Sequence, residues 1–180
     1  MIATLYDENR VNVQLAQIAK PMRQAILAIE DDRFYSHGAL DAKGTLRAFI
    51  TNKTNSGNVQ GGSSITQQLV KLTLLANAGN DKAKRKLREL QYAIALEKEH
   101  SKDWILERYL NSAYFGAGAH GVQSAARRYF DKNASKLNAR DAATLAGLVK
   151  NPVGYDPIRS PERALQRRNE VLDRMATLTV

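Results

Sequence analysis

Apolar residues recur at helical spacing along most of the chain. Met22, Ala25, Ile26 and Ile29 form an i, i+3, i+4, i+7 stripe, and this first helix is predicted to end near Asp31. Comparable patterns predict further helices over residues 45–50, from 64 to about 76, over 82–99, from 101 to the glycines near 116, over 122–130, over 138–149 and from 160 onward. The fold class is therefore mainly α.

Two of these helices lead to specific expectations about packing. Ser64 and Gln67 form a capping-box pattern, so we expect a helix to begin there, with Ile65, Leu69, Leu72 and Ala76 lining the core. In residues 82–99 the apolar positions spread over much of the helix circumference. This segment is therefore predicted to be a central helix that is buried on more than one side.

The remaining segments are irregular. Residues 3–13 alternate around a polar centre and indicate a short hairpin or an irregular segment, and residues 51–62 (TNKTNSGNVQGG) indicate a mobile loop. No internal repeat or long linker divides the 180 residues, which suffice for one domain with a sizeable core.

Charge and composition restrict the function classes. The net charge of +9 favours a polyanionic partner, which is a nucleic acid, an anionic membrane surface or a phosphorylated substrate. The absence of cysteine excludes disulfides and Cys-ligated zinc, and three histidines without HExxH spacing make a His-based zinc site unexpected. No window approaches the roughly 20 apolar residues of a membrane span, so we expect a soluble chain or a soluble piece of an anchored protein.

Three acids follow one another at the C-terminal end of the first helix. The helix dipole disfavours Glu30, Asp31 and Asp32 there, so stability does not explain them. Glu30 extends the apolar stripe to its rim, where desolvation and the two neighbouring acids should raise its pKa and suit it to general-base catalysis. An exposed acidic turn paired with Arg33 is the alternative. His37, in the following turn, is expected to orient the backbone.

A Gly-rich segment precedes the helix that begins at Ser64. Glycines 61 and 62 free the backbone before a helix N-terminus, and Ser64, Gln67 and Lys71 recur on one polar face. Backbone N–H groups and the helix dipole favour an anion at such a place, although the segment is no Walker loop. An ordinary capped helix with a solvated lysine is the alternative.

Arg85 and Glu89 share a face of the next helix because they are four residues apart. An exposed ion pair is one interpretation. The other is a cleft that Glu30 and Glu89 flank and that Lys71 and Arg85 line, with the two carboxylates dividing the acid and base steps of sugar chemistry. Gly116, Gly118 and Gly121 resemble a phosphate cradle only weakly, and packing turns explain them better.

Taken together, these segments resemble the family-51 glycosyltransferases, the peptidoglycan polymerase domains of class A penicillin-binding proteins and monofunctional glycosyltransferases. Five motifs match in order: EDDRFYSH (30–37), GGSSITQQLVK (61–71), RKLRE (85–89), ILERYLNSAYFGAGAHGVQSAARRYF (105–130) and residues 145–157. Ala39 replaces a usual glycine and Ser64 stands where threonine is common, which affects local turn geometry. The resemblance implies a lysozyme-like, two-lobed helical fold with a small membrane-proximal jaw at about residues 40–62.

The resemblance also implies roles for individual residues. Glu30 would be the general base for attack by the acceptor sugar 4-hydroxyl, with inversion, and Glu89 would position the departing pyrophosphate or a divalent cation, Mg²⁺ or Mn²⁺, that bridges it. No cofactor is expected to be obligatory. The implied pyrophosphate-binding residues are Lys71, Arg85, Ser64, Gln67, Gln68 and Lys86, and the supporting residues are Asp31, Phe34, His37 and Asn111.

The partners implied are lipid II, the growing lipid-linked strand and the membrane surface, with no nucleic acid. The family normally has an N-terminal membrane helix and often a transpeptidase domain, so we expect a domain that works at the outer face of the bacterial cytoplasmic membrane. A lysozyme-like muramidase or lytic transglycosylase that acts on finished peptidoglycan is the first alternative. A noncatalytic basic module that binds nucleic acid or membrane is the second.

Overall fold

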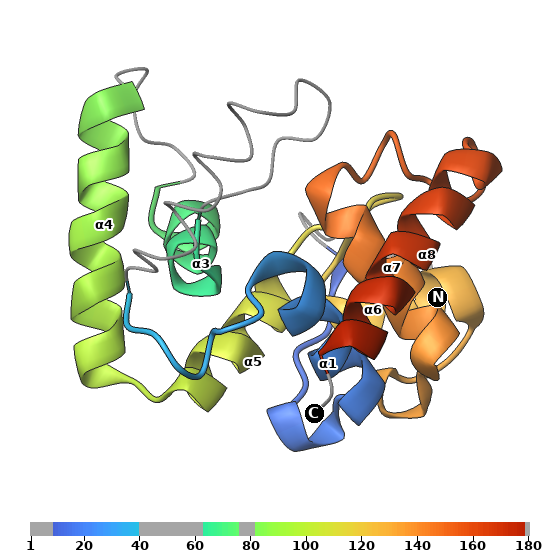
Figure 1. Cartoon of the computed structure of the whole chain (residues 1–180), viewed down its shortest axis with the longest axis horizontal. Helices are drawn as coiled ribbons and strands as arrows, with labels where there is room; N and C mark the ends of the chain where they lie inside the picture. The colour runs from blue at the N-terminus through green and yellow to red at the C-terminus, as the bar shows by residue number, and fades with distance from the viewer. Residues whose placement is uncertain (1–8, 40–62, 76–81, 179–180) are drawn as a thin grey trace, which may run out of the picture. The chain divides into compact units, whose positions relative to one another are not determined.

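The computed structural model describes residues 9–39, 63–75 and 82–178, and these residues are mainly helical, as predicted (Figure 1). The predicted helix at 45–50, the loop at 51–62 and the jaw at about 40–62 lie outside this part of the chain. The helices are α1 (Lys20–Glu30), α3 (Ile65–Thr73), α4 (Lys82–Glu99), α5 (Lys102–Ser112), α6 (Val122–Phe130), α7 (Ala139–Lys150) and α8 (Pro161–Thr177). The 3₁₀ turns η1 (Leu15–Gln17) and η2 (Ala134–Lys136) and the strands β1 (Asn9–Arg10) and β2 (Ala119–His120) accompany them.

The chain divides into two compact units. The first unit comprises Met1–Asp32 and Leu110–Val180, and the second comprises Arg33–Tyr109. No helix in the described ranges is both long and apolar enough to cross a bilayer.

The core of the first unit forms where α1, α7 and α8 pack on one another. Met22, Ala25 and Ile26 are fully buried, which confirms three of the four positions of the predicted stripe, whereas Ile29 is only half-buried. Helix α1 ends where the sequence indicated. Gly147 lets α7 and α8 approach closely, because a Cβ there would lie 2.9 Å from Cγ of Arg167. The small residues of α7 therefore bring the helices of this unit together.

The two short strands pair in parallel across a large sequence separation. Asn9 lies opposite Ala119, so the hairpin alternative is wrong for the described part of residues 3–13. The Asn111 side chain stabilises the same region, since its Oδ1 accepts from the backbone N–H of Val13 at 3.0 Å and its Nδ2 donates to the carbonyl of Val13 at 2.8 Å. Periodicity along the chain indicates only local partners, so it gives no signal for a pairing between segments about 110 residues apart.

The three glycines of the fourth motif occupy positive-φ turns, with φ of 87° at Gly116, 76° at Gly118 and 81° at Gly121. A Cβ on Gly121 would lie only 2.7 Å from the carbonyl oxygen of Asn111. Backbone conformation and close packing therefore require glycine here, which supports the packing-turn interpretation over a phosphate cradle.

Tyr129 makes the stability of the first unit sensitive to alkaline pH. Its hydroxyl donates to the Phe115 carbonyl at 3.0 Å, and burial, followed by the negative charge of Asp156, raises the pKa of Tyr129 to about 12. The folded state then holds the phenolic proton more tightly than the unfolded state, so this stabilisation is complete below pH 10.0 and disappears as the pH rises to about 12.

We expect Tyr129→Phe to remove that component of the pH dependence. Unfolding free energies of parent and variant, measured by denaturant from about pH 9 to about pH 12, should fall more steeply for the parent because only it must release the buried proton. Parallel curves for the two proteins would show that the phenol of Tyr129 ionises alike in both states.

In the second unit α3 packs against α4. A small apolar cluster joins Ala39, Val70, Leu75 and Ala93. The bounds predicted for α4 are confirmed, but its predicted burial on several sides is wrong, since Leu87 is 58% exposed. The physical reason is that, within the described residues, α3 packs against one face of α4 and leaves the face that carries Leu87 uncovered.

The predicted length of α3 is also wrong. The helix ends at Thr73, its C-cap is Leu74, and Leu72 is 41% exposed instead of lining the core. The spacing that placed Leu72 on the apolar stripe holds for Ile65 and Leu69, which are buried, but Leu72 faces solvent and Val70 is buried in its place. Ala76, also expected to line the core, lies outside the described residues.

Candidate active site

The candidate general base belongs to the first unit. Glu30 is the last residue of α1 and is half-buried, and the backbone N–H of Asp31, the C-cap, donates to the Leu27 carbonyl at 2.9 Å. Asp31 is buried, whereas Asp32 is exposed. Glu30 thus lies at the rim of the apolar stripe, as predicted, where a carboxylate is partly desolvated and still reachable.

The turn that follows opens the second unit and is fixed by its own backbone. The Arg33 carbonyl accepts from the backbone N–H groups of Ser36 at 2.8 Å and His37 at 3.1 Å. Nδ1 of His37 lies 2.5 Å from the Gly38 carbonyl oxygen, in agreement with the backbone-orienting role predicted for this histidine.

Side chains of α5 hold the same turn from outside. The ammonium of Lys102 lies 4.5 Å from the ring centroid of the buried Phe34, and the Tyr35 hydroxyl donates to Oδ1 of Asp103 at 2.7 Å. A carboxylate on α4, Glu97, accepts from Lys102 at 2.8 Å. These contacts hold the buried Phe34 in place, so its contribution to the site is to fix the turn that follows α1.

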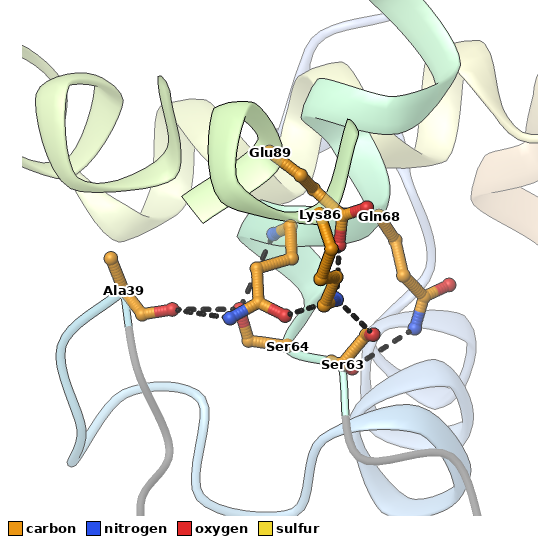
Figure 2. Close-up of polar contacts among 7 residues, drawn as sticks. Ala39, Ser63, Ser64, Gln68, Lys86 and Glu89 are labelled. Carbon is orange, nitrogen blue, oxygen red and sulfur yellow. Dashed lines mark hydrogen bonds and ion pairs between the residues drawn. The ribbon is translucent and has the colours of Figure 1, made fainter. Parts of the chain in front are cut away.

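The start of α3 is built by Ser64 and Gln67. The Ser64 hydroxyl caps the helix by accepting from the backbone N–H of Gln67 at 3.3 Å, and it donates to the Ala39 carbonyl at 3.2 Å. The amide Nε2 of Gln67 donates to the same carbonyl at 3.2 Å (Figure 2). The predicted capping box is thus only half formed, because the glutamine side chain bonds Ala39 instead of closing back on Ser64.

Lys86 is the centre of the polar cluster in Figure 2. Its ammonium donates to Ser63 Oγ at 2.9 Å, Gln67 Oε1 at 3.1 Å and Glu89 Oε1 at 2.5 Å. These contacts match the three N–H donors of an ammonium. The Lys86 side chain is 54% exposed while that of Glu89 is 6% exposed, so a buried carboxylate anchors a cation that still faces solvent at the start of α3.

Helical spacing suggested that Glu89 forms an ion pair with Arg85, four residues before it, but the structure shows a different partner. Its carboxylate bonds Lys86 at i−3 instead. Arg85 is half-buried, and Lys71 is exposed in the last turn of α3. Their predicted contact with pyrophosphate stays a prediction.

The structure therefore brings together one group of the predicted residues within the second unit. These are Ser64, Gln67, Gln68, Lys86 and Glu89, joined by Ser63 and the Ala39 carbonyl, which the sequence argument missed. Glu30, Asp31 and Asn111 lie in the first unit, and Asn111 serves the backbone of Val13 there. Sequence spacing alone gave no signal for Ser63, since only the fold brings α4 to it.

Within the described ranges, no three His, Cys, Asp or Glu side chains are placed together to hold a metal ion. The one buried carboxylate of the cluster, Glu89, is already engaged by Lys86. This donor set does not fit a protein-bound divalent cation, which prefers several oxygen ligands.

A protein-family model described as transglycosylase matches residues 1–176. The chain is 43% identical over 175 residues to penicillin-binding protein 1F of Bacillus subtilis and 42% identical over 176 residues to penicillin-binding protein 1A of Streptococcus pneumoniae. Each alignment covers 97% of this chain and 24% of the relative. Penicillin-binding protein 1A of Mycobacterium tuberculosis is 44% identical over 171 residues, which are 94% of this chain and 21% of that protein.

Proposed function

Because the chain belongs to the transglycosylase family, we propose that it polymerises lipid II into peptidoglycan glycan strands. The observation that carries this proposal is the polar cluster at the start of α3, where Ser63, Gln67 and Glu89 hold the half-exposed ammonium of Lys86. A lipid-linked sugar donor leaves as a pyrophosphate, and a helix N-terminus with a fixed cation stabilises such an anion. The family and the relatives support glycosyltransferase activity and do not favour the lytic alternative.

The proposed reaction needs one base and one stabilised leaving group. Glu30 removes the proton of the acceptor 4-hydroxyl while that oxygen attacks the anomeric carbon of the growing chain, which is the donor. The bond from this carbon to the pyrophosphate oxygen breaks, and undecaprenyl pyrophosphate leaves with the electron pair. Attack from the opposite face inverts the configuration and gives a β-1,4 link. General-base assistance of this kind contributes about 10²- to 10⁴-fold to the rate.

The charges at α3 receive the pyrophosphate in this proposal. The N–H groups of the first helical turn and the Lys86 ammonium supply fixed positive charge, and Lys71 and Arg85 add to it. Glu89 acts through Lys86: as a buried anion it would repel a pyrophosphate, but as a partner it fixes where the ammonium points. Lys86 thus takes the central place that the spacing argument gave to Arg85.

A divalent cation, if present, would be bound mainly by the phosphate oxygens of the substrate. Mg²⁺ commonly binds substrate phosphates and waters with one or two carboxylates, and the cluster of Lys86 and Glu89 offers no larger cage in the described ranges. No step of the proposed reaction depends on that ion.

The chain spans about a quarter of the length of the relatives reported above. We propose that the protein works at the outer face of the cytoplasmic membrane, together with a transpeptidase domain and a membrane anchor. The net charge of +9 and the exposed apolar side chains Leu74 and Leu87 of the second unit support a working position at an anionic lipid surface.

The experiment that tests the function supplies lipid II as the sole sugar substrate in detergent. A polymerase should release one undecaprenyl pyrophosphate for each glycosidic bond it forms, and it should leave finished peptidoglycan intact. A folded protein that releases no lipid pyrophosphate but shortens finished strands would be a muramidase, because hydrolysis of those strands needs no pyrophosphate site.

A further inference from the structure

Tyr109 is a completely buried tyrosine in an otherwise apolar stripe. It lies on α5 beside Ile105, Leu106 and Leu110, all of which are fully buried. Packing alone would be served by phenylalanine, since a phenolic hydroxyl without a partner in such a place is destabilising. The hydroxyl of Tyr109 therefore needs an explanation beyond the core.

Its hydroxyl donates to Oε1 of Gln68 on α3 at 2.9 Å, a contact between residues 41 positions apart. The other end of the same amide, Nε2, donates to the Ser63 carbonyl at 3.5 Å (Figure 2). A flipped amide would place its oxygen against the Ser63 carbonyl, where two acceptors repel. The donor on one side and the acceptor on the other thus define one orientation of Gln68.

That orientation matters at a site for an anion. With Oε1 turned toward Tyr109, Gln68 presents N–H donors at the start of α3, on the side of Ser63, which also bonds Lys86. A flipped or freely rotating amide would present its carbonyl oxygen, with partial negative charge, to a phosphate oxygen. Preorganised donors stabilise developing charge without reorganisation during the reaction.

We propose that Tyr109 is a positioning residue for glycosyl transfer, whose hydroxyl holds the Gln68 amide with Nε2 toward the pyrophosphate of the donor. This inference rests on the proposed function. Tyr109 touches no reacting atom in this account and acts only through Gln68.

The test is a double-mutant cycle on kcat/KM for lipid II, with Tyr109→Phe, Gln68→Ala and the combined variant. Tyr109→Phe should lower kcat/KM about 5- to 30-fold, the effect of losing one or two hydrogen-bond equivalents in a transition state. In the Gln68→Ala background the same change should have no further effect on kcat/KM, because the group through which Tyr109 acts is gone. A merely structural hydroxyl would reduce activity equally in both backgrounds.

The matched control is Tyr129→Phe, which removes the hydroxyl of a partly buried tyrosine in the first unit that donates to a backbone carbonyl. Its shift in melting temperature should resemble that of Tyr109→Phe, while its kcat/KM stays at the parent value. Should Tyr109→Phe fold poorly, Gln68→Glu replaces the donor end of the amide with a carboxylate oxygen, which also adds a negative charge, and keeps an oxygen for Tyr109. This variant should weaken inhibition by inorganic pyrophosphate at least tenfold, by analogy with removal of one anion-binding donor.

Several outcomes would overturn the inference. They are equal losses from Tyr109→Phe in both backgrounds, an unchanged kcat/KM in Tyr109→Phe, and unchanged pyrophosphate inhibition in Gln68→Glu. Failure of the proposed function is distinguishable from these, because the parent protein would then release no lipid pyrophosphate from lipid II at all.

Discussion

Glu30→Gln should lower the rate of lipid II polymerisation by about 10²- to 10⁴-fold while the protein stays folded. Glutamine has the shape of glutamate but cannot accept the proton of the attacking hydroxyl. Glu30 ends α1 at the rim of its buried face and is only half-buried, so the substitution removes little packing. Initial rates with labelled lipid II, taken beside melting temperatures, check this expectation.

The matched control for Glu30 is Asp32→Asn, which neutralises the exposed acid two residues away. Its rate should stay close to that of the parent. For the parent, the rate should increase with pH as the base loses its proton, and this limb of the pH profile should be missing from the residual activity of Glu30→Gln. A Glu30→Gln protein within roughly threefold of the parent rate would exclude Glu30 as the base, since general-base catalysis exceeds that factor.

Lys86→Met should have the second-largest effect, with a loss of about 10²- to 10³-fold in kcat/KM. The substitution removes the cation at the start of α3 and leaves the buried Glu89 without the partner that holds it at 2.5 Å. Because Lys86 is itself half exposed, we expect the free energy of unfolding to fall by only about 1–3 kcal/mol, less than for a fully buried pair. Steady-state kinetics and denaturant unfolding measure the two effects separately.

The double variant Lys86→Met/Glu89→Gln separates charge from stability. A neutral amide in place of Glu89 removes the uncompensated buried charge, so much of the lost stability should return. The activity should stay low, because the cation that stabilises the pyrophosphate is still missing. Recovery of activity together with stability would mean that Lys86 has only a structural role.

Local patterns were sufficient for many of the helices. The bounds of α4 match the predicted range, and α1 ends at Glu30, because apolar spacing acts within a few residues of the chain. The packing of α4 could not be predicted in the same way. Apolar residues such as Leu87 are found around its circumference, but which of them are covered depends on where α3 lies.

Contacts between distant segments also determine the candidate site, and local spacing could not predict them. Both Arg85 and Lys86 can reach Glu89 by helical spacing, and the choice of Lys86 depends on Ser63 and Gln67, which α3 brings to it. Tyr109 lies at the spacing of an apolar stripe, which indicates only a core residue, because its hydrogen bond to Gln68 connects segments that are distant in the sequence. The residue types in the motifs indicated the kind of chemistry, but only the tertiary structure shows which of these side chains contact one another.

The most direct test of the account resolves by length the products that this chain and Glu30→Gln form from labelled lipid II in detergent. We expect a ladder of glycan strands from the parent and none, at equal protein concentration and reaction time, from the folded variant. Ladders of equal length and intensity from both proteins, or a parent that consumes no lipid II but cleaves finished peptidoglycan, would contradict it.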